Sequence, residues 1–136
     1  MSKETILSIN EGTFNPVKDN HRSFEGIVII TDKQIIETGI EGGQDCCESF
    51  GYLTSEDNIK SFEGASLLGL TRTDTCLNVE QYNKEFPYGL DGGDTMFINI
   101  ETSKGTLQIV VYNNHNGYYG HEAFIRSEQL NEKEVL

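Results

Sequence analysis

The chain has 136 residues, 36 % of them hydrophobic, and its 22 acidic and 10 basic residues give a formal net charge of −12. This length fits one domain with a lean core, and the acidic excess disfavours direct nucleic-acid binding, because phosphates would be repelled. No stretch approaches the roughly 18 apolar residues of a membrane helix, and residues 1–10 lack the pattern of a secretory signal, so we expect no membrane association.

The first part of the chain predicts a hairpin and a third strand. Residues 5–9 are apolar without a clear type, and residues 10–20 are polar and predict a surface loop. Residues 25–31 (EGIVIIT) are β-branched and almost continuously apolar, as expected of a buried strand. Two polar residues separate this run from residues 34–38 (QIIET), which predicts a hairpin. Residues 44–53 follow as a third strand.

The middle of the chain predicts a short helix, a strand and a loop. Ser55 can cap a helix whose first turn is acidic, because acids complement the positive end of the helix dipole. We expect this helix to end by Gly64. A strand begins at Leu67 and continues into Arg72, and residues 74–94 contain the proline and glycines of a loop.

The last third predicts a second hairpin. Residues 95–101 (TMFINIE) and 106–112 (TLQIVVY) flank a short connection that ends in Gly105, which suits the left-handed position of a turn. Residues 118–125 predict a final strand, and the segment after Ser127 predicts a short helix or a frayed end. Alternation along the second strand of the hairpin gives two faces: Leu107, Ile109 and Val111 on one, and Gln108, Val110 and Tyr112 on the other.

These elements together indicate the fold class. Strands outnumber helices, so we expect an α+β fold that is mostly antiparallel β-sheet with one or two short helices. Residues 1–136 are expected to form a single domain, in which residues 1–20 and 127–136 are loosely ordered.

Two motifs contain residue types that bind metals. The first is residues 44–48 (QDCCE), and the second is residues 113–122 (NNHNGYYGHE). Thiolate, imidazole and carboxylate groups are ordinary ligands of tetrahedral Zn²⁺, and a structural site would stabilise a small domain with a lean core. The candidate ligands are Asp45, Cys46, Cys47, His115 and His121. Because no Cys-x-x-Cys or His-x-x-x-His pair is present, a buried cysteine and turn histidines are the alternative.

The cysteines also bear on compartment and catalysis. An odd number of three, with Cys46 and Cys47 adjacent, does not form a disulfide framework and indicates a reducing cytosol. Either of these cysteines with His121 and Asp45 would have the composition of a small Cys/His hydrolase. The sequence shows neither a thiolate-promoting site nor an oxyanion hole, so we expect binding without turnover.

The QDCCE segment followed by NGYYGHE resembles an uncharacterised family of small β-rich proteins from bacteriophages and other mobile elements. The likeness covers residues 26–125 and rests on residues 44–48 and 116–119. Relatives in that family carry a histidine just before the first motif, where this chain has residues 41–43 (EGG). The resemblance implies a mobile-element protein that acts in the cytoplasm of a host bacterial cell.

Proteins from that setting suggest a function by analogy. Small acidic proteins of mobile elements are similar in size and charge to anti-CRISPR inhibitors of type II Cas9. Cas9 holds guide and target in positively charged channels, so an acidic protein could bind there and block DNA loading. The resemblance therefore implies a counter-defence protein with a basic protein partner, Cas9 first among them. The candidate partner-binding acids are Glu37, Glu41, Glu48, Glu56, Asp57, Glu63, Asp74, Asp91 and Asp94.

Other interpretations of the same residues stay open. The acidic charge serves solubility in many proteins, and each of these acids could be a solvated loop charge. A sponge that sequesters a host nucleotide signal is a further function class, in which Tyr118 and Tyr119 would stack on the base. Such a protein needs cations for phosphate, and the three arginines are scattered along the chain.

Overall fold

The computed structural model describes residues 4–14, 24–41, 49–56, 58–73, 75–85, 93–114, 122–128 and 130–136. At positions 41, 49, 50, 93, 94, 114, 122, 134 and 135 the description covers the backbone alone. Antiparallel strands dominate these residues, and they are accompanied by one short α-helix and one 3-10 turn. The expected mixture of elements is therefore confirmed. In these parts of the chain, no helix combines the length and apolar character needed to cross a membrane.

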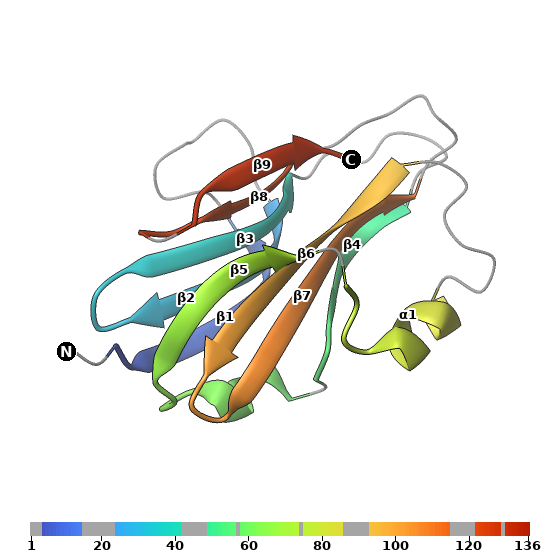
Figure 1. Cartoon of the computed structure of the whole chain (residues 1–136). Coiled ribbons are helices and arrows are strands. Elements are labelled where there is room, and N and C mark those ends of the chain that lie inside the picture. Colours follow the sequence, from blue (N-terminus) through green and yellow to red (C-terminus); the bar gives the residue numbers. More distant parts are fainter. Residues whose placement is uncertain are drawn as a thin grey trace.

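The strands form two antiparallel sheets (Figure 1). The five-stranded sheet has the order β1 (Ile6–Phe14), β2 (Phe24–Thr31), β3 (Ile35–Glu41), β8 (Glu122–Arg126) and β9 (Glu132–Val135). The four-stranded sheet has the order β4 (Ser49–Thr54), β7 (Gly105–Asn114), β6 (Gly93–Thr102) and β5 (Leu67–Thr73). The 3-10 turn η1 (Ile59–Phe62) lies between β4 and β5, and α1 (Val79–Glu85) lies between β5 and β6.

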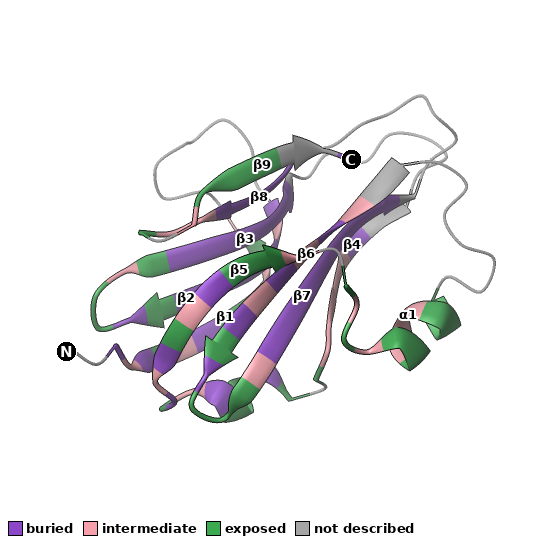
Figure 2. Ribbon diagram, in the orientation of Figure 1, coloured by how far each residue is buried: buried purple, intermediate pink, exposed green. Residues whose placement is uncertain are grey.

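The two sheets pack face to face around a core rich in isoleucine. Isoleucines of β1, β2 and β3 meet those of β6 and β7, and the inward side chains are almost completely shielded from solvent (Figure 2). β5 begins beside β1, where Thr5 and Ser66 form an isolated antiparallel β-bridge. β5 ends beside the opposite edge strand, where Arg72 Nη1 lies 3.4 Å from Glu132 Oε1 of β9. Strands of the two sheets therefore cross one another, as in orthogonally packed sandwiches.

Both predicted hairpins are confirmed. β2 pairs with β3, and β6 pairs with β7 through a tight turn in which Gly105 has a φ of 119°, a backbone conformation that favours glycine. The predicted alternation along β7 is confirmed as well, because Leu107, Ile109 and Val111 belong to the core between the sheets. The strand expected from Leu67 to Arg72 is present as β5.

Four expectations about local structure were wrong. Residues 10–14 are not a loop but the end of β1, an edge strand that pairs with β2 along its whole polar half. Ser55 does not cap a helix, since its Oγ accepts a hydrogen bond from the Gln108 amide and the only helical turn described nearby is η1. The α1 helix was not predicted. The C-terminal segment forms β9, a short charged strand that pairs with β8.

The predicted third strand and the predicted last strand are described in part. Of residues 44–53, the structure describes positions 49–53, which lie in β4. Of residues 118–125, it describes positions 122–125, which lie in β8. Within residues 1–20 and 127–136, which were expected to be loosely ordered, β1 and β9 are hydrogen-bonded into the five-stranded sheet.

A pair of glycines brings β2 and β3 unusually close together. Gly26 and Gly39 are direct partners in the register of the two strands. A Cβ added to Gly26 would lie 2.1 Å from the Thr38 carbonyl oxygen, and one added to Gly39 would lie 2.2 Å from the Glu25 carbonyl oxygen. Both distances are far shorter than any van der Waals contact, and in both cases the obstacle is backbone. Glycine is therefore required at both positions.

The outer face of β7 is buried too, because the Gln108 side chain holds a neighbouring segment of the chain against it. Gln108 has no solvent exposure although it points away from the core. Its Oε1 accepts a hydrogen bond from the Leu77 amide at 2.9 Å, and its Nε2 donates to the Thr75 carbonyl and to Asn99 Oδ1, both at 2.8 Å. The segment that leads into α1 is thereby fixed to the outside of the four-stranded sheet.

Candidate functional site

The predicted zinc ligands Asp45, Cys46, Cys47, His115 and His121 lie outside the described residues, so their convergence stays a prediction. Within the described ranges, no group of three or more His, Cys, Asp and Glu side chains is arranged to hold a metal ion. The one cysteine described is Cys76. Burial raises the pKa of its thiol, so this group is protonated at neutral pH and is not an activated nucleophile.

The predicted partner-binding acids fall into three groups. Glu48, Asp57, Asp74 and Asp91 lie outside the described residues, and Glu41 and Asp94 lie in β3 and β6 with side chains that are not described. The side chains that are described belong to Glu37, Glu56 and Glu63.

These three described acids differ in their access to solvent. Glu37 is 4 % exposed and stands opposite Arg126 in the register of β3 and β8. This burial corrects the expectation for Glu37, because a shielded carboxylate cannot contact a docked partner. Glu63 is half-buried, and its Oε2 accepts a hydrogen bond from the Ile9 amide at 2.9 Å. Glu56 is exposed, as expected for an interface residue.

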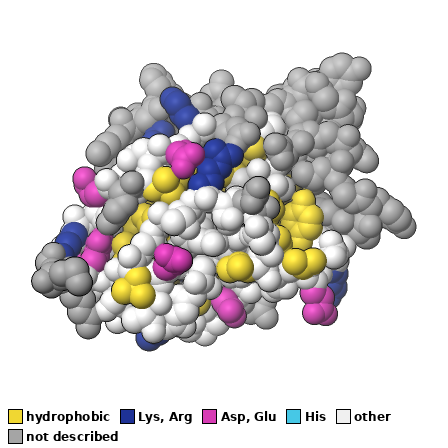
Figure 3. Space-filling view, in the orientation of Figure 1, with side chains coloured by type: hydrophobic (Ala, Val, Ile, Leu, Met, Phe, Trp, Pro, Cys, Tyr) yellow, Lys and Arg dark blue, Asp and Glu magenta, His cyan; other side chains and the backbone are white. Residues whose placement is uncertain are grey.

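The acidic side chains visible in Figure 3 are dispersed over that face, and Lys and Arg side chains lie between them. They do not gather into a single patch there. A dispersed arrangement creates a general negative potential, whereas a specific binding site requires several groups that converge. The convergent groups lie elsewhere, at the side of the sandwich where the two sheets meet.

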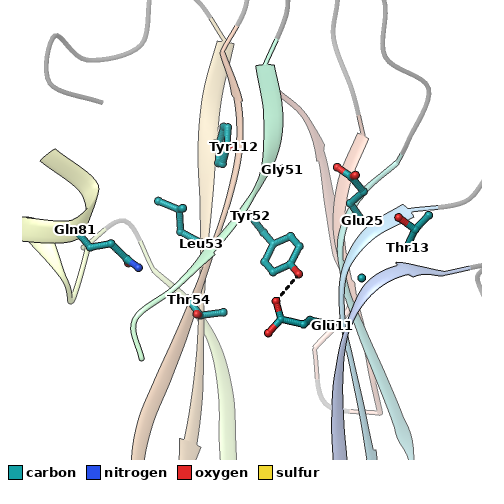
Figure 4. A pocket seen from close by; sticks show the side chains of 10 residues that line it. Glu11, Thr13, Glu25, Gly51, Tyr52, Leu53, Thr54, Gln81 and Tyr112 are labelled. Carbon is teal, nitrogen blue, oxygen red and sulfur yellow. Dashed lines mark hydrogen bonds between the residues drawn. The ribbon is translucent and has the colours of Figure 1, made fainter. Parts of the chain in front are cut away.

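An open cavity of about 440 Å³ lies along the free edge of β4, where the two sheets meet (Figure 4). β1 and β2 supply one wall with Glu11 and Glu25, and β4 supplies the other with Tyr52. The lining continues around β4 to the outer face of the four-stranded sheet, where Tyr112 of β7 and Gln81 of α1 lie (Figure 4). Both Glu11 and Glu25 sit in register with core isoleucines, since Glu11 pairs with Ile27 and Glu25 lies two residues before it.

Tyr52 connects the two walls of this cavity. Its hydroxyl donates a hydrogen bond to Oε1 of Glu11 at 2.9 Å, between β4 and β1 (Figure 4). Burial raises the pKa of Tyr52 well above its ordinary value, and the hydrogen bond to Glu11 and the negative charges of Glu11 and Glu25 raise it further. The phenol therefore keeps its proton at neutral pH and remains a donor.

The ionisable groups of the cavity fit a cation. Glu25 has a part-buried carboxylate that makes no hydrogen bond or ion pair with the described chain, and the described lining contains no Lys or Arg. Two carboxylates beside the Tyr52 ring favour a positive ligand group. A phosphate would be repelled there, so this cavity does not support a sponge for nucleotides.

A second cavity, of about 270 Å³, lies over β8 and β9 and is mixed in charge. Its lining includes Arg126 and Lys133 together with Glu132. The Arg126 guanidinium lies 4.7 Å from the centre of the Phe124 ring, and Arg72 is paired with Glu132. These contacts involve Arg126 and Glu132, and the mixed charge of the lining favours no single class of ligand, so we take the inter-sheet cavity as the candidate site.

A comparison with protein-family models identifies the family of this chain. A family model described as a domain of unknown function, DUF7448, matches residues 3–125. The chain belongs to the DUF7448 family. The matched range of this DUF7448 protein contains both walls of the inter-sheet cavity, as well as the predicted zinc ligands and partner-binding acids. No curated protein and no solved structure gives a significant match.

Proposed function

We propose that this DUF7448 protein acts by binding, without turnover, to a basic protein that handles nucleic acid, and that it inhibits that partner. Cas9 is the specific candidate, and counter-defence by a mobile element is the biological role that goes with it. The net charge of −12 supports a basic partner and argues against direct contact with DNA or RNA.

One observation carries this proposal. The exposed carboxylates of Glu56, Glu80, Glu85 and Glu101 make no ion pair and accept no side-chain hydrogen bond within the described chain. Acids that serve the fold are paired or buried, as Glu37 and Glu63 are. Exposed acids without internal partners are available to the cations of another protein, and their dispersed arrangement suits long-range steering toward a basic channel.

The proposed mechanism is competition for a basic channel. Cas9 holds the guide–target duplex through its backbone in a positively charged channel, so the carboxylates of a docked protein would replace the DNA phosphates. Inhibition by this route requires the protein to bind before DNA does. Screening also sets its salt dependence, because the Debye length falls from about 8 Å at 0.15 M salt to about 3 Å at 1 M.

The test is a DNA-cleavage assay with several purified Cas9–guide complexes. Added in excess before the DNA, the protein is expected to prevent cleavage, whereas the same amount added after DNA loading has little effect. A variant in which Glu56, Glu80, Glu85 and Glu101 are all changed to Gln should inhibit less. The control variant carries Gln at Lys33, Lys84 and Lys104 and should inhibit at least as well. Unchanged cleavage with every Cas9 tested would refute the proposal.

The structural zinc site belongs to the same proposal. Asp45, Cys46, Cys47, His115 and His121 supply the thiolate, imidazole and carboxylate groups that zinc prefers, and metal binding would add folding free energy to a lean core. We expect about one equivalent of zinc in protein purified without chelator, measured by elemental mass spectrometry, and a loss of metal in Cys47→Ser. A content below about a tenth of an equivalent would remove zinc from the proposal.

A further inference from the structure

We infer that the free edge of β4 accepts an extended segment of the basic partner as an added β-strand. The inference rests on the proposed function for the source of that segment, and it identifies the part of the surface that orients the complex. Dispersed surface acids accelerate association but define no orientation. Strand addition does define one, because main-chain hydrogen bonds fix the register of the incoming segment and its alternate side chains then meet opposite faces.

The backbone of β4 has unpaired groups along its free edge. Among the described strands, β4 pairs only with β7. Ser55 continues this pairing, because its amide donates to the Gln108 carbonyl oxygen at 2.9 Å. Every second residue of an antiparallel pair directs its N–H and C=O groups at the neighbouring strand, so Ser55 and Leu53 face β7. The N–H and C=O groups of Tyr52 and Thr54 therefore point away from β7, and they have no partner in the described chain.

The other edge strands carry features that oppose an added strand. At β1, the Ile9 amide donates to Glu63 Oε2 at 2.9 Å, and the Ile9 carbonyl oxygen accepts from Lys60 Nζ at 2.7 Å. β5 has a register shift between Leu67 and Gly69, and β9 (EKEV) is mostly charged. Charged side chains and bulges are the usual protection of sheet edges. β4 (SFGYLT) has no charged residue, no proline and no register shift, so among the described edge strands it is the unprotected one.

The inter-sheet cavity provides the space for an added strand. It has a volume of about 440 Å³ and runs along the free edge of β4. β4 and β1 are connected there by the side chains of Tyr52 and Glu11 and not by backbone hydrogen bonds (Figure 4). The lining continues on both faces of β4, and successive side chains of a strand also point to opposite faces. The cavity therefore has the shape that an extended segment beside β4 requires.

The two sides of the cavity differ in chemistry. The inner side carries the carboxylates of Glu11 and Glu25, and the described lining contains no Lys or Arg. The outer side carries Leu53 and Tyr112, with Gln81 of α1 on the same side (Figure 4). A segment in which basic and apolar residues alternate is therefore favoured, because its basic side chains meet the carboxylates. A second copy of the chain is disfavoured, since each copy has a net charge of −12 and β4 contains no basic residue.

The first experiment uses the protein alone, with the peptide acetyl-Lys-Val-Lys-Val-Lys-amide as the probe and amide hydrogen exchange followed by NMR. In the free protein we expect fast exchange at Tyr52 and Thr54 and slow exchange at Leu53, whose amide faces β7. At about 10 mM peptide, a Kd of roughly 1 mM corresponds to about tenfold slower exchange at Tyr52 and Thr54. The same peptide with every backbone amide N-methylated keeps its charge and loses its donors, so it should leave both amides unchanged.

A matched pair of variants tests the backbone contact. Thr54→Pro removes an N–H group that faces away from β7, which edge strands tolerate, and Thr54→Ala keeps that group. Both variants lose the hydroxyl hydrogen bond to the Glu56 carbonyl oxygen. We expect Thr54→Pro to bind the peptide about tenfold more weakly or worse, and Thr54→Ala to bind it as the parent protein does. If Thr54→Pro loses the dispersed spectrum of a folded protein, the comparison of the two peptides on the parent protein decides.

Four results of these measurements would overturn the inference. Slow exchange at Tyr52 and Thr54 in the free protein at every concentration would show that the edge is already covered. Slowing that grows with protein concentration, without peptide, would identify a second copy as the occupant. Equal binding of the N-methylated peptide would show attraction by charge alone. Unchanged exchange at about 10 mM of the unmodified peptide would show that the edge accepts no such strand.

The second experiment uses the partner and separates this inference from the proposed function. Weaker binding of Thr54→Pro to Cas9, compared with Thr54→Ala, supports the inference. Equal binding of Cas9 by the two variants overturns the inference, while the proposed function stands. Strand addition of the peptide at β4, in a protein that binds no Cas9, refutes the proposed function and leaves β4 as a binding site for basic extended segments.

Discussion

The Tyr52 hydroxyl donates a hydrogen bond to Oε1 of Glu11, and this contact of 2.9 Å joins β4 of one sheet to β1 of the other. Tyr52→Phe removes the donor and keeps the ring. We expect a loss of about 1 kcal/mol in the free energy of unfolding, because a net hydrogen bond contributes about that much and this one is partly open to solvent. Urea unfolding measures the difference. Equal midpoints for Tyr52→Phe and the parent protein would contradict it.

The raised pKa of Tyr52 predicts a change of stability with pH. The folded state holds the phenolic proton more tightly than the unfolded state, in which tyrosine has a pKa of about 10. The corresponding stabilisation is complete below about pH 10 and is lost as the pH rises toward the folded pKa. Unfolding free energy should therefore fall above about pH 10, and it should fall less in Tyr52→Phe. Identical pH profiles for the two proteins would show that Tyr52 is not responsible.

The close approach of β2 and β3 predicts a large effect of one methyl group. Gly26→Ala places a Cβ against the Thr38 carbonyl oxygen, so the strands must separate, and we expect a loss of about 3 kcal/mol. Gly12→Ala is the control, since it has a φ of 142° but no atom within 4 Å of an added Cβ, and it should lose about 1 kcal/mol from backbone strain alone. Thermal unfolding of the two variants gives the ranking, and a more stable Gly26→Ala would contradict the structure.

The hydrogen bonds of Gln108 predict that its replacement loosens the segment that leads into α1. Gln108→Ala removes the acceptor of the Leu77 amide and a donor to the Thr75 carbonyl, so we expect faster hydrogen exchange at Leu77 and a loss of about 2 kcal/mol in unfolding free energy. Asn99→Ala removes one acceptor from Gln108 Nε2 and keeps the bond to Leu77. Exchange at Leu77 should therefore be near normal in Asn99→Ala. Equal protection of Leu77 in both variants would contradict the assignment.

The hairpins could be predicted because their determinants are local. The β-branched run of β2 and the glycine at position 105 specify strand and turn within a few residues. β1 was missed because its second half is polar, and β9 because it is charged, and the pairing of both edge strands is decided by distant partners rather than by their own composition. The arrangement of two sheets, with β5 crossing from β1 toward β9, depends on packing that no local pattern encodes.

The sequence does indicate one residue of the candidate site, Glu25. Glu25 has the same strand parity as Ile27 and Ile29, so alternation already placed a carboxylate on the core-facing side of β2. Glu11 fell within residues 10–20, which were predicted to be a loop, and alternation could not be applied there. The contact of Glu11 with Tyr52 joins residues 41 positions apart in different sheets, so sequence alone gave no means of pairing them.

The pairing of β3 with β8 also has a consequence for synthesis on the ribosome. β3 ends at Glu41 and its partner begins at Glu122, and the whole four-stranded sheet is encoded between them. The N-terminal three strands therefore emerge long before the strand that covers the edge of β3. Until then an apolar face and an open strand edge are available to other nascent chains. Expression yield should consequently depend on chaperones and temperature more than the stability of the finished fold would suggest.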